Sequence, residues 1–194
     1  METRNLLITG FDPFGGESVN PSWLAVSRLP EKIGAYTVHK MEIPTVFGEA
    51  AAKVLEKAVE IQPELILCVG QAGGRSAVTP ERIAVNIRDA RIADNAGNQP
   101  QGEFVATDGP AAYFSTIPVV KMAEAIRNAQ IPATVSNSAG AFVCNDVLYT
   151  LLHHYHGSAT RAGFIHVPYL PEQGNPSLSL HQTVAALIAA IEAC

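Results

Sequence analysis

The chain has 194 residues, of which 47% are hydrophobic, and this length favours one folded domain over residues 1–194 rather than two. Its 13 basic and 18 acidic residues give a net charge of −5, and the basic residues are scattered, so neither a nucleic acid nor an anionic membrane is an expected partner. The N-terminus "METRNLLITG" carries charges and only a short apolar run before a glycine, far below the length of a signal-peptide core or a membrane span. Three cysteines without a Cys-x-x-Cys pair suggest no disulfide framework, so we expect a soluble protein of the reducing cytoplasm.

Apolar patterns alternate along the chain between strand and helix signals. The predicted strands are residues 5–10, 36–44, 64–70, 82–92, 132–140 and 162–170. The predicted helices are residues 20–29, with Asn20 as N-cap and Pro21 in the first turn, 46–62, 119–130, a helix from Cys144, and 179–194. This alternation predicts an α/β fold of three layers, in which a mainly parallel, twisted open sheet carries helices on both faces. Residues 92–112, rich in Gly, Asn, Asp and Pro, form the one long irregular segment.

Four loops follow predicted strands and are therefore expected at one edge of the sheet. They read "GFDPFGG" (10–16), "GQAGG" (70–74), "NSAGAFVC" (137–144) and "HVPYLPE" (166–172). In open sheets of this kind ligands bind beyond the carboxyl ends of the strands. The pattern therefore places Cys144 and His166 on the same side of the molecule.

Cys144 is the cysteine with a reason to be reactive. Cys68 lies inside the apolar run "ELILCVG", as expected of a small buried thiol, and Cys194 is the last residue, where fraying is expected. Cys144 stands where a helix begins, so unpaired N–H groups and the positive end of the helix dipole favour its thiolate. We therefore predict a thiol pKa below the free value of about 8.5. Asp146, in the same turn, would oppose the thiolate if it pointed inward, and we expect it to point outward.

His166 is the candidate general base, because it ends a buried-looking strand; a purely structural histidine is the alternative. His153 and His156 share a helix face, but no further ligands complete a metal site, so none is predicted. Phe11 and Phe14 lie three residues apart on a glycine-rich loop. They either plug the core beneath the loop or form the apolar wall of a small-molecule pocket.

Several blocks in one order extend over nearly the whole chain and carry a family resemblance. They are "LITGFDPFGGESVNPSW" (7–23), "CVGQAGGR" (68–75), "TPERIAVNIRDARIADNAGNQP" (79–100), "GPAAYF" (109–114), "SAGAFVCN" (138–145), "GFIHVPYLPEQ" (163–173) and "PSLSL" (176–180). With these blocks the chain resembles the pyrrolidone-carboxylate peptidases, also called pyroglutamyl peptidase I, which are cytosolic cysteine peptidases.

The resemblance implies Cys144 as nucleophile, His166 as its base and Glu81 as the carboxylate that orients the imidazole. The chemistry of the residues alone proposes the Cys–His pair but does not select Glu81 among the chain's other acidic residues. The resemblance also implies that Arg91 stabilises the oxyanion together with the backbone N–H of Cys144. The alternative for Arg91 is an ion pair with one of the two acids near it, Asp89 or Asp94.

The implied substrate is a peptide or amide with an N-terminal pyroglutamyl residue, a flat lactam without an ammonium group. Phe11 and Phe14 match the family residues that pack on the ring, and backbone groups at Gln71 would serve the lactam N–H and C=O. The resemblance implies no metal or organic cofactor, and a homo-oligomer, commonly a tetramer. Two other functions stay open: a thiol-dependent amidase acting on another small neutral amide, and a non-enzymatic small-ligand binder using the same pocket.

Overall fold

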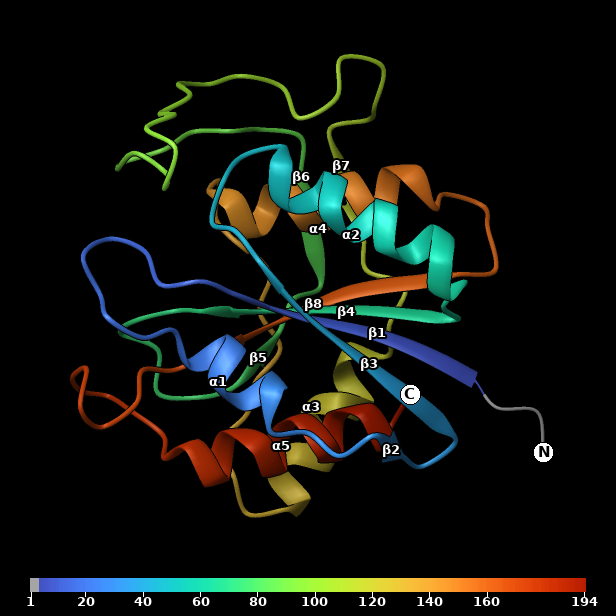
Figure 1. Ribbon diagram of the computed structural model, residues 1–194, viewed down its shortest axis with the longest axis vertical. Coiled ribbons are helices and arrows are strands. Elements are labelled where there is room, and N and C mark those ends of the chain that lie inside the picture. Colours follow the sequence, from blue (N-terminus) through green and yellow to red (C-terminus); the bar gives the residue numbers. More distant parts are fainter. Residues whose placement is uncertain (1–3) are drawn as a thin grey trace.

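A six-stranded sheet forms the centre of the protein in the computed structural model, which describes residues 4–194 (Figure 1). Its strands, in spatial order, are β2 (Lys32–Ile33), β3 (Tyr36–Ile43), β1 (Arg4–Phe11), β4 (Leu65–Gln71), β8 (Arg161–Val167) and β5 (Thr79–Pro80). The four long strands run parallel, and the two short edge strands pair antiparallel. The prediction of a mainly parallel sheet is confirmed. The four long strands read as apolar runs or alternations, whereas the two-residue edge strands give no such signal.

Five helices cover the two faces of this sheet, as predicted. They are α1 (Pro21–Ser27), α2 (Glu49–Ile61), α3 (Val119–Asn128), α4 (Val143–His154) and α5 (Leu180–Glu192). Helices α1, α3 and α5 lie on one face, and α2 and α4 on the other (Figure 1). Asn20 caps α1 as predicted, since its Oδ1 accepts a 3.0 Å hydrogen bond from the N–H of Ser22. Each face has its own apolar core, because β1 and β4 are buried on both sides.

The predicted strand over residues 82–92 is only partly formed. Strand β6 (Ile83–Val85) pairs with β7 (Ala112–Phe114) in a separate two-stranded sheet beside α4. Beyond β6 the backbone N–H groups of residues 86, 88 and 90 bond to carbonyls of the irregular segment 92–112, and that of residue 89 bonds to the carbonyl of residue 141, before α4. The alternating pattern therefore marks an extended segment that threads between loops, and its pairing partners were not readable locally.

The predicted strand over residues 132–140 is wrong. Only two isolated bridges form there, from Ala133 to Val78 and from Ser136 to Glu81. Pro80 and Pro132 supply no N–H, so a continuous ladder between these two segments is interrupted. The bridges nevertheless hold the segment beside β5, and it leads directly to α4.

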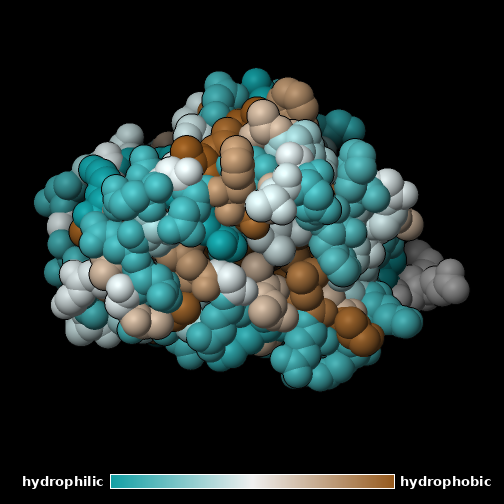
Figure 2. Space-filling view, turned by 90° about the horizontal axis from the view of Figure 1, so that it is seen from above, coloured by the Kyte–Doolittle hydropathy of each residue, from teal (hydrophilic) through white to brown (hydrophobic). Residues whose placement is uncertain are grey.

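The carboxyl ends of β1, β4 and β8 lie at one edge of the sheet, as their parallel pairing requires. The irregular segment predicted for residues 92–112 passes over the same side of the molecule as α2 and α4 and contains no helix (Figure 1). The surface seen from that side is mostly hydrophilic, with small hydrophobic areas between (Figure 2). Within residues 4–194, no helix is long and apolar enough to span a bilayer.

Candidate active site

A cavity of about 620 Å³ opens at this carboxyl edge, and it collects side chains from distant parts of the chain. Its lining includes the predicted residues Phe14, Gln71, Arg91, Cys144 and His166. The cavity is therefore built by the loop after β1, the end of β4, the segment after β6, the start of α4 and the end of β8. The prediction that Cys144 and His166 lie on one side of the sheet agrees with this placement.

Glycine at position 70 brings the thiol and the imidazole together. Gly70 on β4 is directly paired with His166 on β8. A Cβ atom at Gly70 would lie 2.9 Å from the Cys144 Sγ and 2.8 Å from the Phe164 ring. The thiol therefore rests on the bare backbone of the residue that neighbours His166, a place that only glycine leaves open.

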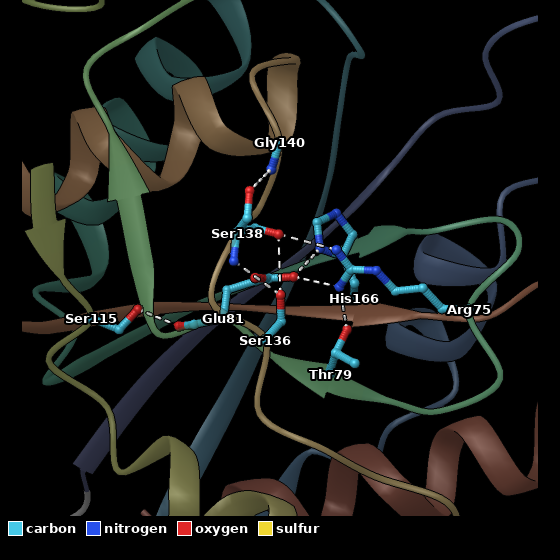
Figure 3. A network of polar contacts seen from close by, with 8 residues as sticks. All are labelled: Arg75, Thr79, Glu81, Ser115, Ser136, Ser138, Gly140 and His166. Atoms are coloured by element: carbon cyan, nitrogen blue, oxygen red, sulfur yellow. Dashed lines mark hydrogen bonds and ion pairs between the residues drawn. The ribbon is translucent and has the colours of Figure 1, made fainter.

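The register of β5 against β8 places a carboxylate behind the imidazole. Thr79 pairs with His166. Glu81 lies two residues further along, and its N–H donates to the Phe164 carbonyl at 2.9 Å. Side chains two residues apart in extended backbone share a face, so Glu81 reaches the His166 ring. The His166 Nδ1 lies 2.7 Å from the Glu81 Oε1 (Figure 3). A carboxylate only accepts, so the neutral ring carries its proton on Nδ1 and leaves Nε2 as the base.

Glu81 is fully buried and not an exposed loop acid. Burial by itself raises the pKa of Glu81, but the hydrogen bond and charge of His166, and then the side chains of Ser136 and Arg75, outweigh it, so the pKa lies below its usual value. Burial also lowers the pKa of His166 below its ordinary value, although the bond to Glu81 opposes this. The resting site therefore pairs an ionised carboxylate with a neutral imidazole.

The prediction of a lowered thiol pKa at Cys144 is wrong for this structure. Burial, and next the negative charge of Glu81, raise the pKa of Cys144 to about 12. The start of α4 is as predicted, since Phe142 is the N-cap residue and its side chain accepts no capping hydrogen bond. The free N–H groups there do not outweigh desolvation, because the thiol lies against Phe164 and the backbone of Gly70. The resting site therefore holds a neutral thiol and a neutral imidazole.

The expected outward direction of Asp146 is also wrong. Its side chain is fully buried, and its Oδ2 accepts a 2.8 Å hydrogen bond from the Gly48 N–H. Its Oδ1 accepts from the Arg88 Nε at 2.6 Å. The start of α4 is packed against the start of α2 and the segment after β6, so no solvent-facing direction exists at this position. The arginine offsets the charge that was expected to oppose the thiolate.

Arg91 is exposed and borders the cavity. The alternative ion pair with Asp94 is not formed, because that carboxylate is bound elsewhere: it accepts from the backbone N–H groups of residues 47, 96 and 98. The Asn98 side-chain amide and then these backbone bonds lower the pKa of Asp94 against the opposing effect of burial. Asp94 therefore fixes the loop that follows Arg91.

The structure separates the two aromatic side chains predicted to form the pocket wall. Phe14 lines the cavity, and its ring centroid lies 6.1 Å from that of Phe142. Phe11 is only 2% exposed and packs in the core against Phe164, so the alternative of a core plug describes Phe11. Gln71 borders the cavity at the end of β4.

Among the cavity residues that the sequence reasoning missed, three have large side chains that shape the site. Phe142 and Ile92 add apolar wall, and Arg75 bonds to Glu81. Phe142 stands one residue before α4, and its apolar character was a readable signal. Arg75, in "GQAGGR", gave no signal, because nothing in the local sequence shows that its side chain turns toward Glu81, six residues further on. One carboxylate, the exposed Asp89, also borders the cavity.

An α/β fold that brings a thiol and an imidazole to one cavity, with a buried carboxylate behind the imidazole, defines a hydrolase of the cysteine type. The sequence profile of the family described as pyroglutamyl peptidase matches residues 4–194. The chain belongs to this family of cysteine omega-peptidases.

Relatives and solved structures agree with this assignment. The chain is 53% identical over 195 residues to a pyrrolidone-carboxylate peptidase of Levilactobacillus brevis, covering 97% of this chain and 96% of the relative. Its fold is similar to the crystal structure of Bacillus amyloliquefaciens pyroglutamyl peptidase I, with a TM-score of 0.94 and 47% identity over 98% of this chain and 96% of the other. The pyrrolidone carboxyl peptidase of Thermococcus litoralis also has a TM-score of 0.94, at 39% identity, covering 98% and 93% of the two chains.

Proposed function

We propose that this chain hydrolyses the bond after an N-terminal pyroglutamyl residue, releasing pyroglutamate from peptides and amides, with Cys144 as nucleophile, His166 as general base and acid, and Glu81 as the orienting carboxylate. The observation that carries the assignment of roles is the 2.7 Å contact between the Glu81 Oε1 and the His166 Nδ1. His166 is paired in the sheet with Gly70, the glycine that lies beneath the Cys144 sulfur. This leaves the imidazole Nε2 as the nitrogen that serves the thiol.

Because the resting thiol is neutral, its proton must leave as the sulfur attacks. The His166 Nε2 takes the proton from the Cys144 Sγ while the sulfur adds to the substrate carbonyl carbon. Glu81 stabilises the imidazolium that results. The carbonyl oxygen becomes an oxyanion, for which the Cys144 N–H and Arg91 are the proposed donors; each donor is worth on the order of 3 kcal/mol in the transition state.

Collapse of the intermediate then breaks the C–N bond. The imidazolium gives its proton to the leaving amine, and pyroglutamate remains as a thioester on Cys144. Water, deprotonated by His166, attacks the thioester carbonyl and releases pyroglutamate with the free thiol. No step needs a metal or an organic cofactor, so we expect chelators to leave the activity unchanged.

The shape and chemistry of the cavity support a lactam substrate. Phe14 and Phe142 offer aromatic wall for a flat ring, and the backbone at Gln71 is the proposed partner of the lactam N–H and C=O. An ordinary N-terminus brings an ammonium group that would lose its hydration against these walls. The exposed Asp89 offers little compensation, because solvent screens its charge.

The test is release of a fluorescent amine from its pyroglutamyl amide, with prolyl and glutaminyl amides of the same amine beside it. We expect turnover of the pyroglutamyl amide alone, lost in Cys144→Ser and His166→Ala and after treatment with iodoacetamide. Preferred turnover of another neutral amide would point to a different thiol amidase. Ligand binding unaffected by Cys144→Ala, with no hydrolysis by the parent, would point to a binding protein.

Three further features are proposals of the same kind. We infer that residues 1–194 form one catalytic domain and that the protein works in the cytoplasm as a homo-oligomer, a tetramer by family resemblance. The free state of its cysteines is compatible with a reducing compartment. Mass measured by light scattering at working concentration tests the oligomeric state.

A further inference from the structure

We propose that Arg75 is a positioning residue for the reaction, which fixes the Glu81 carboxylate and offsets its charge at the thiol–imidazole pair. The inference rests on the roles proposed above for Cys144, His166 and Glu81. Arg75 lies in the loop that joins β4 to β5 and borders the cavity.

The guanidinium of Arg75 contacts the proposed catalytic carboxylate and two groups beside it. The Arg75 Nη1 donates to the Glu81 Oε1 at 2.6 Å, and this is the same oxygen that accepts from the His166 Nδ1. Nη1 also donates to the Thr79 Oγ1 at 2.6 Å, and Nη2 donates to the Ser138 carbonyl at 3.1 Å (Figure 3). One planar group thus joins strand β5, the proposed catalytic carboxylate and the segment that leads to α4.

Glu81 depends on this clamp because its carboxylate is fully buried. His166 and Arg75 both donate to its Oε1, and the Ser136 side chain also favours the ionised form. The Oε2 has no direct hydrogen-bond partner among the described residues. Without Arg75, His166 is the side chain that still donates to Oε1, and the carboxylate gains rotational freedom.

The charge of Arg75 has a second effect on the reacting pair. The negative charge of the carboxylate by itself favours the protonated forms of both His166 and Cys144. It attracts the imidazolium of His166 and would repel the thiolate of Cys144. The guanidinium, on the same oxygen, opposes this. Removing the cation therefore favours protonation of both groups, and both limbs of the pH–rate profile move to higher pH.

Two substitutions divide geometry from charge. Arg75→Gln keeps a donor and removes the charge; we expect both limbs of the kcat/KM profile to rise on the order of one pH unit, and kcat to fall on the order of tenfold with KM little changed. Arg75→Lys keeps the charge but loses the planar fork, so the limbs stay at the parent's pH while kcat falls.

The matched control is Arg161→Gln. Arg161 is also partly buried and paired with a glutamate, Glu64, but it lies at the start of β8, at the opposite end of the strand from His166. We expect it to lower thermal stability and leave both limbs in place. If the pH–rate profile of Arg75→Gln keeps both limbs at the parent's pH and only its plateau is lower, Arg75 forms a structural ion pair and the proposal is overturned.

A second readout needs no turnover. The rate of alkylation of Cys144 by iodoacetamide at pH 8, located by peptide mapping, should fall on the order of tenfold in Arg75→Gln and remain near the parent's in Arg75→Lys. If the parent and the two variants are alkylated at these relative rates but the parent releases no pyroglutamate, the proposed function is contradicted and this inference still holds. If Arg75→Gln does not fold by circular dichroism, Arg75→Lys decides, because an unchanged kcat there contradicts the clamp.

Discussion

The bare backbone at Gly70 gives the sharpest test of the site geometry. In Gly70→Ala, the new Cβ would lie 2.9 Å from the Cys144 Sγ and 2.8 Å from the Phe164 Cζ. Ordinary contacts are about 3.5–4.0 Å, so the sulfur must retreat by roughly 0.6 Å or more, or the strand must move. The backbone of Gly70 is not in the left-handed region, so alanine brings a collision without dihedral strain.

The expected result is a large loss of activity with a moderate loss of stability. Displacement of a nucleophile by about 1 Å costs on the order of 10²-fold in rate, so we expect kcat/KM for the pyroglutamyl amide to fall by about that factor. Overpacking of a filled core costs about 1–3 kcal/mol in the free energy of unfolding. Amine release measures the first quantity and urea unfolding the second.

Gly163→Ala is the matched control. Gly163 lies on β8, and its Cβ would meet the Ile117 side chain at 2.2 Å, away from Cys144. We expect a comparable or larger loss of stability, with kcat/KM retained by the folded fraction. The reasoning is refuted if Gly70→Ala keeps kcat/KM within about threefold of the parent, or if the two variants lose activity equally.

Three further predictions concern the titration and the wall of the site. Burial lowers the pKa of His166, so Nε2 is protonated only at a pH below the ordinary histidine pKa of about 6.5. The acid limb of the kcat/KM profile should therefore have its midpoint below that pH, and a midpoint above it contradicts a neutral buried base. Because burial raises the pKa of Cys144 to about 12, alkylation by iodoacetamide should still be rising with pH at 9, and a plateau near 8.5 or below is the contrary result. Phe14→Ala should raise KM for the pyroglutamyl amide on the order of tenfold, whereas Phe114→Ala, at a ring that is 70% exposed, should leave KM unchanged.

Local sequence patterns predicted those parts of the fold whose causes are local. Asn20 and Pro21 mark the start of α1 because an Asx side chain caps and proline fits the first turn, and both do so here. The apolar run around Cys68 predicts a fully buried strand, and burial raises the pKa of that thiol to about 12. Such features depend on a few neighbouring residues.

The predictions that proved wrong concern features that depend on partners far along the chain. Residues 132–140 have strand-like composition, but Pro80 and Pro132 interrupt the pairing that they would need. The pKa of Cys144 follows the same logic, since the helix start is local and readable, whereas the packing of Phe164 and Gly70 against the sulfur is not. Desolvation outweighs the helix dipole, whose effect near a helix end is about 0.3–1 kcal/mol.

Glu81 shows why the residues alone did not select the carboxylate of the proposed triad. It is 85 positions from His166, follows a proline and belongs to no periodic pattern. Its role depends on β5 pairing antiparallel to β8 with Thr79 opposite His166, because only that register turns Glu81 toward the imidazole. A slip of one residue would turn the carboxylate to the other face of the sheet and would leave the arginine of the preceding loop without its partner. The edge strand is two residues long, so the bonds of Arg75 to Thr79 and Glu81 stabilise the register that the chemistry requires.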